Sequence, residues 1–133
     1  MRIMLDSNVI FSAISYSNSV TAKVLEHLKS NHTLVISQYI IDETELIFLR
    51  KCSKDFVYLR RMLDMLPDEV HTSSFVDTKL YPYIKDEDDI PVLADAIEAG
   101  VDILITGDKD FDVVKIDKPT ILKPRQYMEI YMK

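Results

Sequence analysis

The sequence lacks the features that hold an extracellular or membrane protein together. Cys52 is the only cysteine among 133 residues, which excludes an internal disulfide framework and a zinc site built from cysteines. No apolar run approaches the roughly 20 residues that a membrane-spanning helix needs. The chain also reaches Asp6 without the apolar region of about 7–15 residues found in a signal peptide. We therefore expect a cytoplasmic protein that makes no contact with a membrane.

Glycine is scarce, and no segment is repetitive or of low complexity. Glycine is limited to Gly100 and Gly107, so the sequence contains no flexible linker that would divide it. A chain of this length can bury roughly two thirds of the surface that it exposes when unfolded, which is enough for a core of its own. We therefore expect a single domain over residues 1–133.

Positive charge is in the minority, with 16 Lys and Arg against 22 Asp and Glu and a formal net charge of −6. This balance argues against wrapping nucleic acid over the whole surface, because phosphate contacts come from Lys and Arg. Nucleic-acid binding would depend on locally basic strips. One candidate RNA-binding strip consists of Arg50, Lys51, Lys54, Arg60 and Arg61, and a second of Lys115, Lys118, Lys123 and Arg125.

Short apolar runs alternate with helical patterns along the chain. The runs that predict buried strands cover residues 2–6, 33–37, 102–106 and 120–122. The apolar spacing between them predicts helices after Ser17 or Ser19, around 40–48, over 56–66 before Pro67, and over 92–97 before Gly100. Apolar strands separated by amphipathic helices favour an α/β fold with helices on both faces of a parallel sheet, here of four to five strands.

Acidic residues gather where such a sheet binds ligands, beyond the carboxyl ends of its strands. Asp6 ends the first strand, and Asp108 follows the strand at 102–106 by two residues. Asp88 and Asp89 precede the helix that leads into that strand. Each acid has a structural alternative, since Asp6 could cap the next turn and acids stabilise a helix N-terminus.

Glu43 is the more informative acid, because helical spacing places it at the edge of an apolar stripe. Its alternative role is an ion pair with Arg50. Asp110 lies with Asp108 in a turn where aspartate is common for conformational reasons alone. The remaining acids of the last helix and its end, Asp95, Glu98 and Asp102, are assigned to the polar side that faces solvent.

Carboxylates that converge from separate elements form the hard oxygen site that Mg²⁺ or Mn²⁺ prefers. Such a site favours phosphodiester hydrolysis, in which one metal activates water and a second, about 3.5–4 Å away, stabilises the leaving oxygen. The three histidines, His27, His32 and His71, have no ligand spacing to one another and are assigned to the surface or to strand ends. Cys52 lacks a neighbouring catalytic histidine and is expected to pack as a small apolar side chain.

The motifs resemble the PIN domain family, specifically the small prokaryotic type that includes VapC-like toxin components. The matching segments cover most of the chain, at residues 3–10, 36–43, 86–96 and 103–111. The resemblance implies a three-layer α/β/α fold and a metal-dependent ribonuclease. It implies that the Mg²⁺ or Mn²⁺ ligands are Asp6, Glu43, Asp89 and Asp108, with Asp110 as a fifth. Asn8, Ser37, Thr106 and Asp86 would be supporting polar residues, although Asp86 and Asp88 compete with Asp89.

The resemblance also implies an RNA substrate and a small antitoxin protein as a partner, and the apolar faces of the helices allow a homodimer. Two alternatives remain. The first is a catalytically silent PIN-like binding module. The second is a receiver-like signalling domain, which would share the parallel fold and a late Lys123-Pro124 pair. The receiver needs a phosphate-accepting aspartate after its third strand, whereas Asp55 and Asp64 lie in helical patterns.

Overall fold

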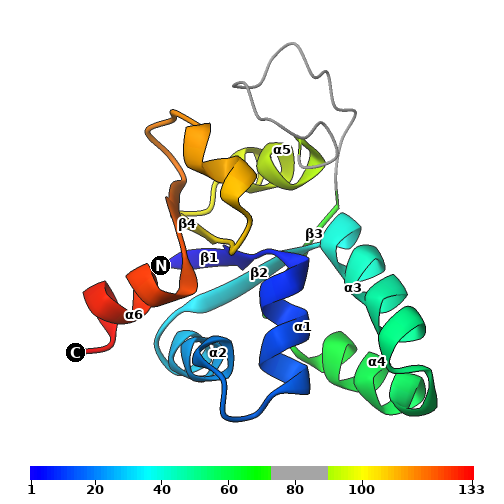
Figure 1. Cartoon of the computed structure of the whole chain (residues 1–133). Coiled ribbons are helices and arrows are strands. Elements are labelled where there is room, and N and C mark those ends of the chain that lie inside the picture. The colour runs from blue at the N-terminus through cyan, green and yellow to red at the C-terminus, as the bar shows by residue number, and fades with distance from the viewer. Residues whose placement is uncertain (73–89) are drawn as a thin grey trace.

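A parallel sheet lies at the centre of the computed structural model, which describes residues 1–72 and 90–133 (Figure 1). Within those residues the sheet has five strands in the order β3-β2-β1-β4-β5. Every neighbouring pair is parallel. The strands are β1 Arg2–Leu5, β2 Thr33–Ser37, β3 Glu69–His71, β4 Ile103–Ile105 and β5 Thr120–Leu122. The predicted parallel sheet of four to five strands is confirmed.

Helices cover both faces of this sheet (Figure 1). Helix α5, Ile90–Glu98, lies on one side, and α1, Ser7–Ser15, and α2, Val20–Asn31, lie on the other. Helix α3, Gln38–Lys51, packs against α1 and against α4, Phe56–Met65. Helix α6, Pro124–Tyr131, packs against α2. The remaining elements are the short 3₁₀ helices η1 Ser53–Asp55 and η4 Lys109–Val113. This arrangement confirms the three-layer α/β/α fold.

The three central strands are apolar because helices cover them on both sides. Ile3, Met4 and Leu5 of β1 are fully buried. So are Leu104 and Ile105 of β4, to which β1 is paired with Leu5 opposite Ile105. The carboxyl ends of these strands therefore meet at one edge of the sheet, directly before Asp6 and Thr106.

The helix ends follow from local chemistry. Ser19 caps α2 by accepting a hydrogen bond from the Ala22 N–H at 3.1 Å. Ser37 caps α3 in the same way, accepting from the Ile40 N–H at 3.1 Å. Gly100 follows α5 with φ of +67°, a left-handed conformation that glycine adopts without the steric cost of a side chain. The cap at Ser19 and the stop at Gly100 agree with the predictions made from the sequence, whereas Ser37 was not predicted as a cap.

The assignment of Asp95 to solvent is wrong, because its side chain is fully buried. The apolar stripe of α5 correctly identified one buried side, but the other side faces the end of β3 rather than water. His71, the last residue of β3, places its Nε2 3.9 Å from Asp95 Oδ1. Glu98 is more exposed and Asp102 is half-buried, as expected for residues nearer the end of the helix and beyond it. No helix in the described ranges is long and apolar enough to cross a membrane.

Candidate active site

Asp6 lies at the junction of β1 and α1 and has a largely buried side chain, with 4% of its surface exposed. Its Oδ1 accepts a hydrogen bond from the Ser7 N–H at 2.8 Å, so the residue does cap α1 as the structural alternative supposed. Its Oδ2 accepts a second hydrogen bond from the Thr106 hydroxyl at 2.7 Å. A buried carboxylate is costly unless donors or cations compensate it. The two donors therefore fix the orientation of Asp6 from two different elements.

Ser7 links Asp6 to Glu43. The Ser7 hydroxyl donates to Glu43 Oε1 in a short hydrogen bond, and its Oγ lies 3.5 Å from Asp6 Oδ1. Glu43 is half-buried on α3, as its place at the edge of the apolar stripe predicts. Ser37 positions that helix through its N-cap. Sequence analysis missed the role of Ser7, since 36 residues separate it from Glu43 and no local spacing relates them.

Thr106 links Asp6 to Asp108 on the other side. Its Oγ1, which donates to Asp6, also accepts a hydrogen bond from the Asp108 N–H at 3.1 Å. Asp108 in turn caps η4, since its Oδ1 accepts from the Asp110 N–H at 2.9 Å. The structure thus brings together Asp6, Glu43 and Asp108 from three separate parts of the sequence.

Burial raises the pKa of Asp6 above its ordinary value of 3.8. The hydrogen bonds from Thr106 and Ser7 oppose this shift, and the negative charges of Glu43 and Asp108 reinforce it. Because the charges of Glu43 and Asp108 both influence the pKa of Asp6, the three carboxylates lie close enough to repel one another. A bound cation would relieve their repulsion.

These carboxylates fit a divalent metal of the hard type. All three offer oxygen ligands, which suit Mg²⁺ or Mn²⁺ better than softer metals. Asp6 is already oriented by two donors, an arrangement typical of ligands held by surrounding hydrogen bonds. Asp6, Glu43 and Asp108 are therefore the described residues that could hold such an ion.

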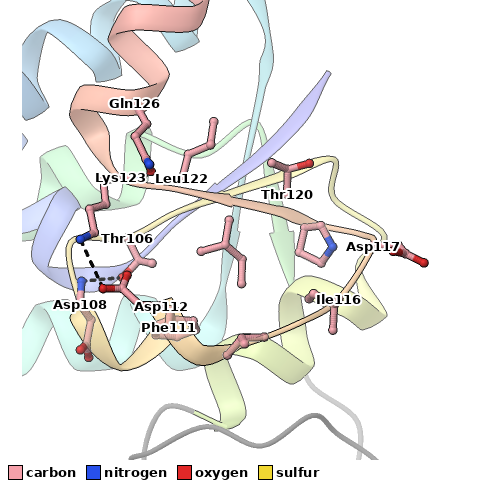
Figure 2. Close-up of a pocket in the computed structure, with 13 residues that line it drawn as sticks. Thr106, Asp108, Phe111, Asp112, Ile116, Asp117, Thr120, Leu122, Lys123 and Gln126 are labelled. Atoms are coloured by element: carbon pink, nitrogen blue, oxygen red, sulfur yellow. Dashed lines mark hydrogen bonds and ion pairs between the residues drawn. The ribbon is translucent and has the colours of Figure 1, made fainter.

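A pocket of about 520 Å³ adjoins this site between η4 and β5 (Figure 2). Thr106 and Asp108 lie at one end, where Lys123 Nζ pairs with Asp112 Oδ2 at 3.5 Å. Apolar side chains, among them Ile116 and Leu122, form much of the remaining wall. Asp117 and Thr120 line the side away from Asp108, and a pocket whose apolar wall lies between polar groups can hold a flat, partly polar group.

Among the predicted site residues not yet placed, the structure describes Asn8 and Asp110. Asp86, Asp88 and Asp89 lie outside the described residues. Asn8 is exposed, and within the described ranges its side chain makes no hydrogen bond to the three carboxylates. Asp110 is half-buried and reaches Asp108 through its backbone N–H.

The predicted basic strip is exposed over the ends of α3 and η1 and along α4. Within it, Arg60 pairs with Glu45 at 3.3 Å, and Lys51 lies 5.1 Å from the centre of the Phe11 ring. Cys52 is half-buried against the core, as expected for a small apolar side chain. The strip keeps its charge at the surface, where it can attract a polyanion.

Comparison with known proteins places this geometry in a family. A family model described as PIN domain matches residues 2–110. Solved structures include similar chains, one of them from the crystal structure of VapBC2 from Rickettsia felis bound to a DNA fragment from their promoter. That chain is 21% identical, with a TM-score of 0.69 over 92% of this chain and 97% of that one. The search of curated proteins finds no match. The chain belongs to the PIN domain family, whose VapC-type members are generally nucleases.

Proposed function

We propose that this protein is a Mg²⁺- or Mn²⁺-dependent endoribonuclease, the toxin component of a toxin–antitoxin pair. One observation carries the proposal. At the carboxyl edge of the parallel sheet, Ser7 donates to the Glu43 carboxylate and Thr106 donates to that of Asp6, while Thr106 also accepts from the backbone N–H of Asp108. Ligands of such sheets bind at this edge. Membership of a family of nucleases supports hydrolysis as the reaction.

Asp6, Glu43 and Asp108 are the proposed metal ligands, and Asp89 is the fourth on the grounds of the sequence motif. Asp110 is a fifth candidate, and Asp86 a supporting residue. A divalent cation held there would activate water for attack on a phosphodiester and stabilise the leaving oxygen. Thr106 and Ser7 act as positioning residues, because their hydroxyls fix the directions in which the carboxylates point.

The RNA would approach over surfaces next to this cluster. Phosphates are attracted to the exposed side chains of the basic strip, Arg50, Lys51, Lys54, Arg60 and Arg61. The pocket beside Asp108 suits an unpaired base, since it combines an apolar wall with the polar groups of Lys123 and Gln126. Proteins that read RNA sequence usually take such unstacked bases from single strands.

A protein partner is proposed from exposed apolar side chains on α3 and α4. Leu46, Val57, Tyr58 and Met65 have between 59% and 82% of their surface exposed. Helices α3 and α4 pack against each other, and large apolar side chains exposed on neighbouring helices are typical of a protein interface. A small antitoxin is the proposed partner, in keeping with the likeness to a VapBC2 chain. The second proposed partner for this surface is another copy of the same chain, which would form a homodimer.

Removal of metal tests the proposed reaction directly. The purified protein is incubated with end-labelled single-stranded RNA in Mg²⁺ or Mn²⁺, with EDTA, and with EDTA followed by excess Mn²⁺. We expect internal cleavage that EDTA abolishes and excess Mn²⁺ restores, because the carboxylates alone cannot activate water. Gel electrophoresis of the products gives the rate and the cleavage positions.

Two results would contradict the proposal. Cleavage that persists in EDTA would point to a contaminating ribonuclease or a metal-independent reaction. Binding of RNA without cleavage in either metal, for protein shown to be free of copurified antitoxin, would favour the catalytically silent binding module instead.

A further inference from the structure

A second group of metal-ligating side chains lies between β3 and α5. It consists of His71 at the end of β3 and of Asp95 and Glu98 on α5. One donor atom from each of these three residues lies within 4.8 Å of the others. None of the three belongs to the acidic cluster described above. We propose that His71, Asp95 and Glu98 bind a transition-metal dication, with Zn²⁺ as the best fit.

The distances favour coordination over hydrogen bonding. His71 Nε2 lies 3.6 Å from Glu98 Oε1 and 3.9 Å from Asp95 Oδ1, both beyond the usual range of a hydrogen bond. Two ligands at about 2.0–2.1 Å from one tetrahedral zinc ion are roughly 3.3–3.5 Å apart. Small movements of exposed Glu98 would bring the donor atoms to that spacing.

The buried Nε2 atom of His71 is a second, independent observation. Its Nε2 is buried, yet it makes no hydrogen bond to any residue that the structure describes. A buried imidazole nitrogen usually has a partner, because leaving it unpaired costs folding free energy. Here the atom lies beside two carboxylates. A metal ion can accept the lone pair of such a nitrogen, and zinc commonly combines imidazole with carboxylate ligands.

Asp95 adds a carboxyl group that is fully buried. Asp95 and Glu98 each have a further interaction within the chain, which is compatible with coordination because a carboxylate has two oxygens and about four lone-pair sites. Three protein ligands leave a fourth position for water. The ion would tie the edge strand of the sheet to α5, the helix that begins directly after Asp89.

The test uses the ring protons of histidine in the NMR spectrum of the full chain. The sequence has three histidines, and the signals of His71 are identified by their loss in His71→Gln. We expect one equivalent of Zn²⁺ to shift the His71 signals and to leave those of His27 and His32 in place. Mg²⁺ should leave all three unchanged, since it avoids imidazole ligands. Zinc that leaves the His71 signals of the unaltered protein unchanged would overturn the proposal.

Calorimetry supplies the affinity. Zn²⁺ is titrated into the unaltered protein, His71→Gln and the matched control His32→Gln. We expect His71→Gln to weaken binding at least about tenfold and His32→Gln to have no effect. Equal affinity for all three would overturn the proposal. The NMR response should persist in Asp6→Asn, so this inference and the proposed nuclease site can fail separately.

Discussion

Replacing Asp6 by Asn is expected to reduce RNA cleavage at least about 100-fold, because it removes a charged ligand of the metal that activates water. Asn keeps the shape of Asp, so its oxygen can still accept from the Ser7 N–H and its amide can donate to Thr106. The rate of RNA cleavage in saturating Mn²⁺ measures the effect. Glu26→Gln, which neutralises an exposed acid on α2, is the control and should cleave at the normal rate.

Asp6→Asn should raise the thermal stability of the metal-free protein, although it lowers RNA cleavage. Because the folded protein raises the pKa of Asp6 above 3.8, the protonated form favours folding, and this contribution is lost as the pH rises through the folded pKa. Asp6→Asn should therefore unfold at a higher temperature than the metal-free unaltered protein at neutral pH. The difference should vanish below pH 3.8. Thermal unfolding in EDTA at both pH values measures it, and an inactive variant that is less stable at neutral pH would mean that cleavage was lost through misfolding.

Replacing Thr106 by Val is expected to lower cleavage roughly 10–100-fold, the usual cost of losing a group that orients a metal ligand. Valine has almost the same shape but cannot donate to Asp6 or accept from the Asp108 N–H. Thr106 is nearly fully buried, so the unpaired groups should also cost about 1–3 kcal/mol of folding free energy. Cleavage is measured as a function of Mn²⁺ concentration, together with denaturant unfolding.

The form of the loss distinguishes positioning from a general structural role. We expect Thr106→Val to need a higher Mn²⁺ concentration for half-maximal activity, and Thr106→Ser, which keeps the hydroxyl, to recover most of it. If Thr106→Ser were as impaired as Thr106→Val, the methyl group and its packing, rather than the hydrogen bonds, would be the important feature.

The parts of the fold that could be predicted are those with strong local patterns. Strands β1, β2 and β4 each contain a run of three fully or almost fully buried apolar residues, so their sequences are distinctive. Strand β3 was not assigned because Glu69–His71 is short and lies at the edge of the sheet, where two of its three side chains are exposed. Helix α6 was also missed, although Pro124 at its first position is a usual start signal.

The candidate site also contains residues that the sequence could locate and contacts that it could not. Asp6 and Asp108 could be located because strand ends are visible in the sequence, and Glu43 because it interrupts an apolar stripe. The hydrogen bonds of Ser7 could not be predicted, since they depend on how α1 meets α3. The burial of Asp95 was missed because helical periodicity shows which side of α5 is apolar, but not that the polar side faces His71.

The most direct test of the proposed metal site is a calorimetric titration of Mn²⁺ into the unaltered protein and into Asp6→Asn, with RNA cleavage followed in the same samples. The carboxylate cluster predicts binding and cleavage in the unaltered protein and a loss of both in the variant. Equal Mn²⁺ binding and equal cleavage by the two proteins would contradict the account. The hydrogen bonds around Asp6 would then serve to cap α1 and connect strand ends rather than to hold a metal.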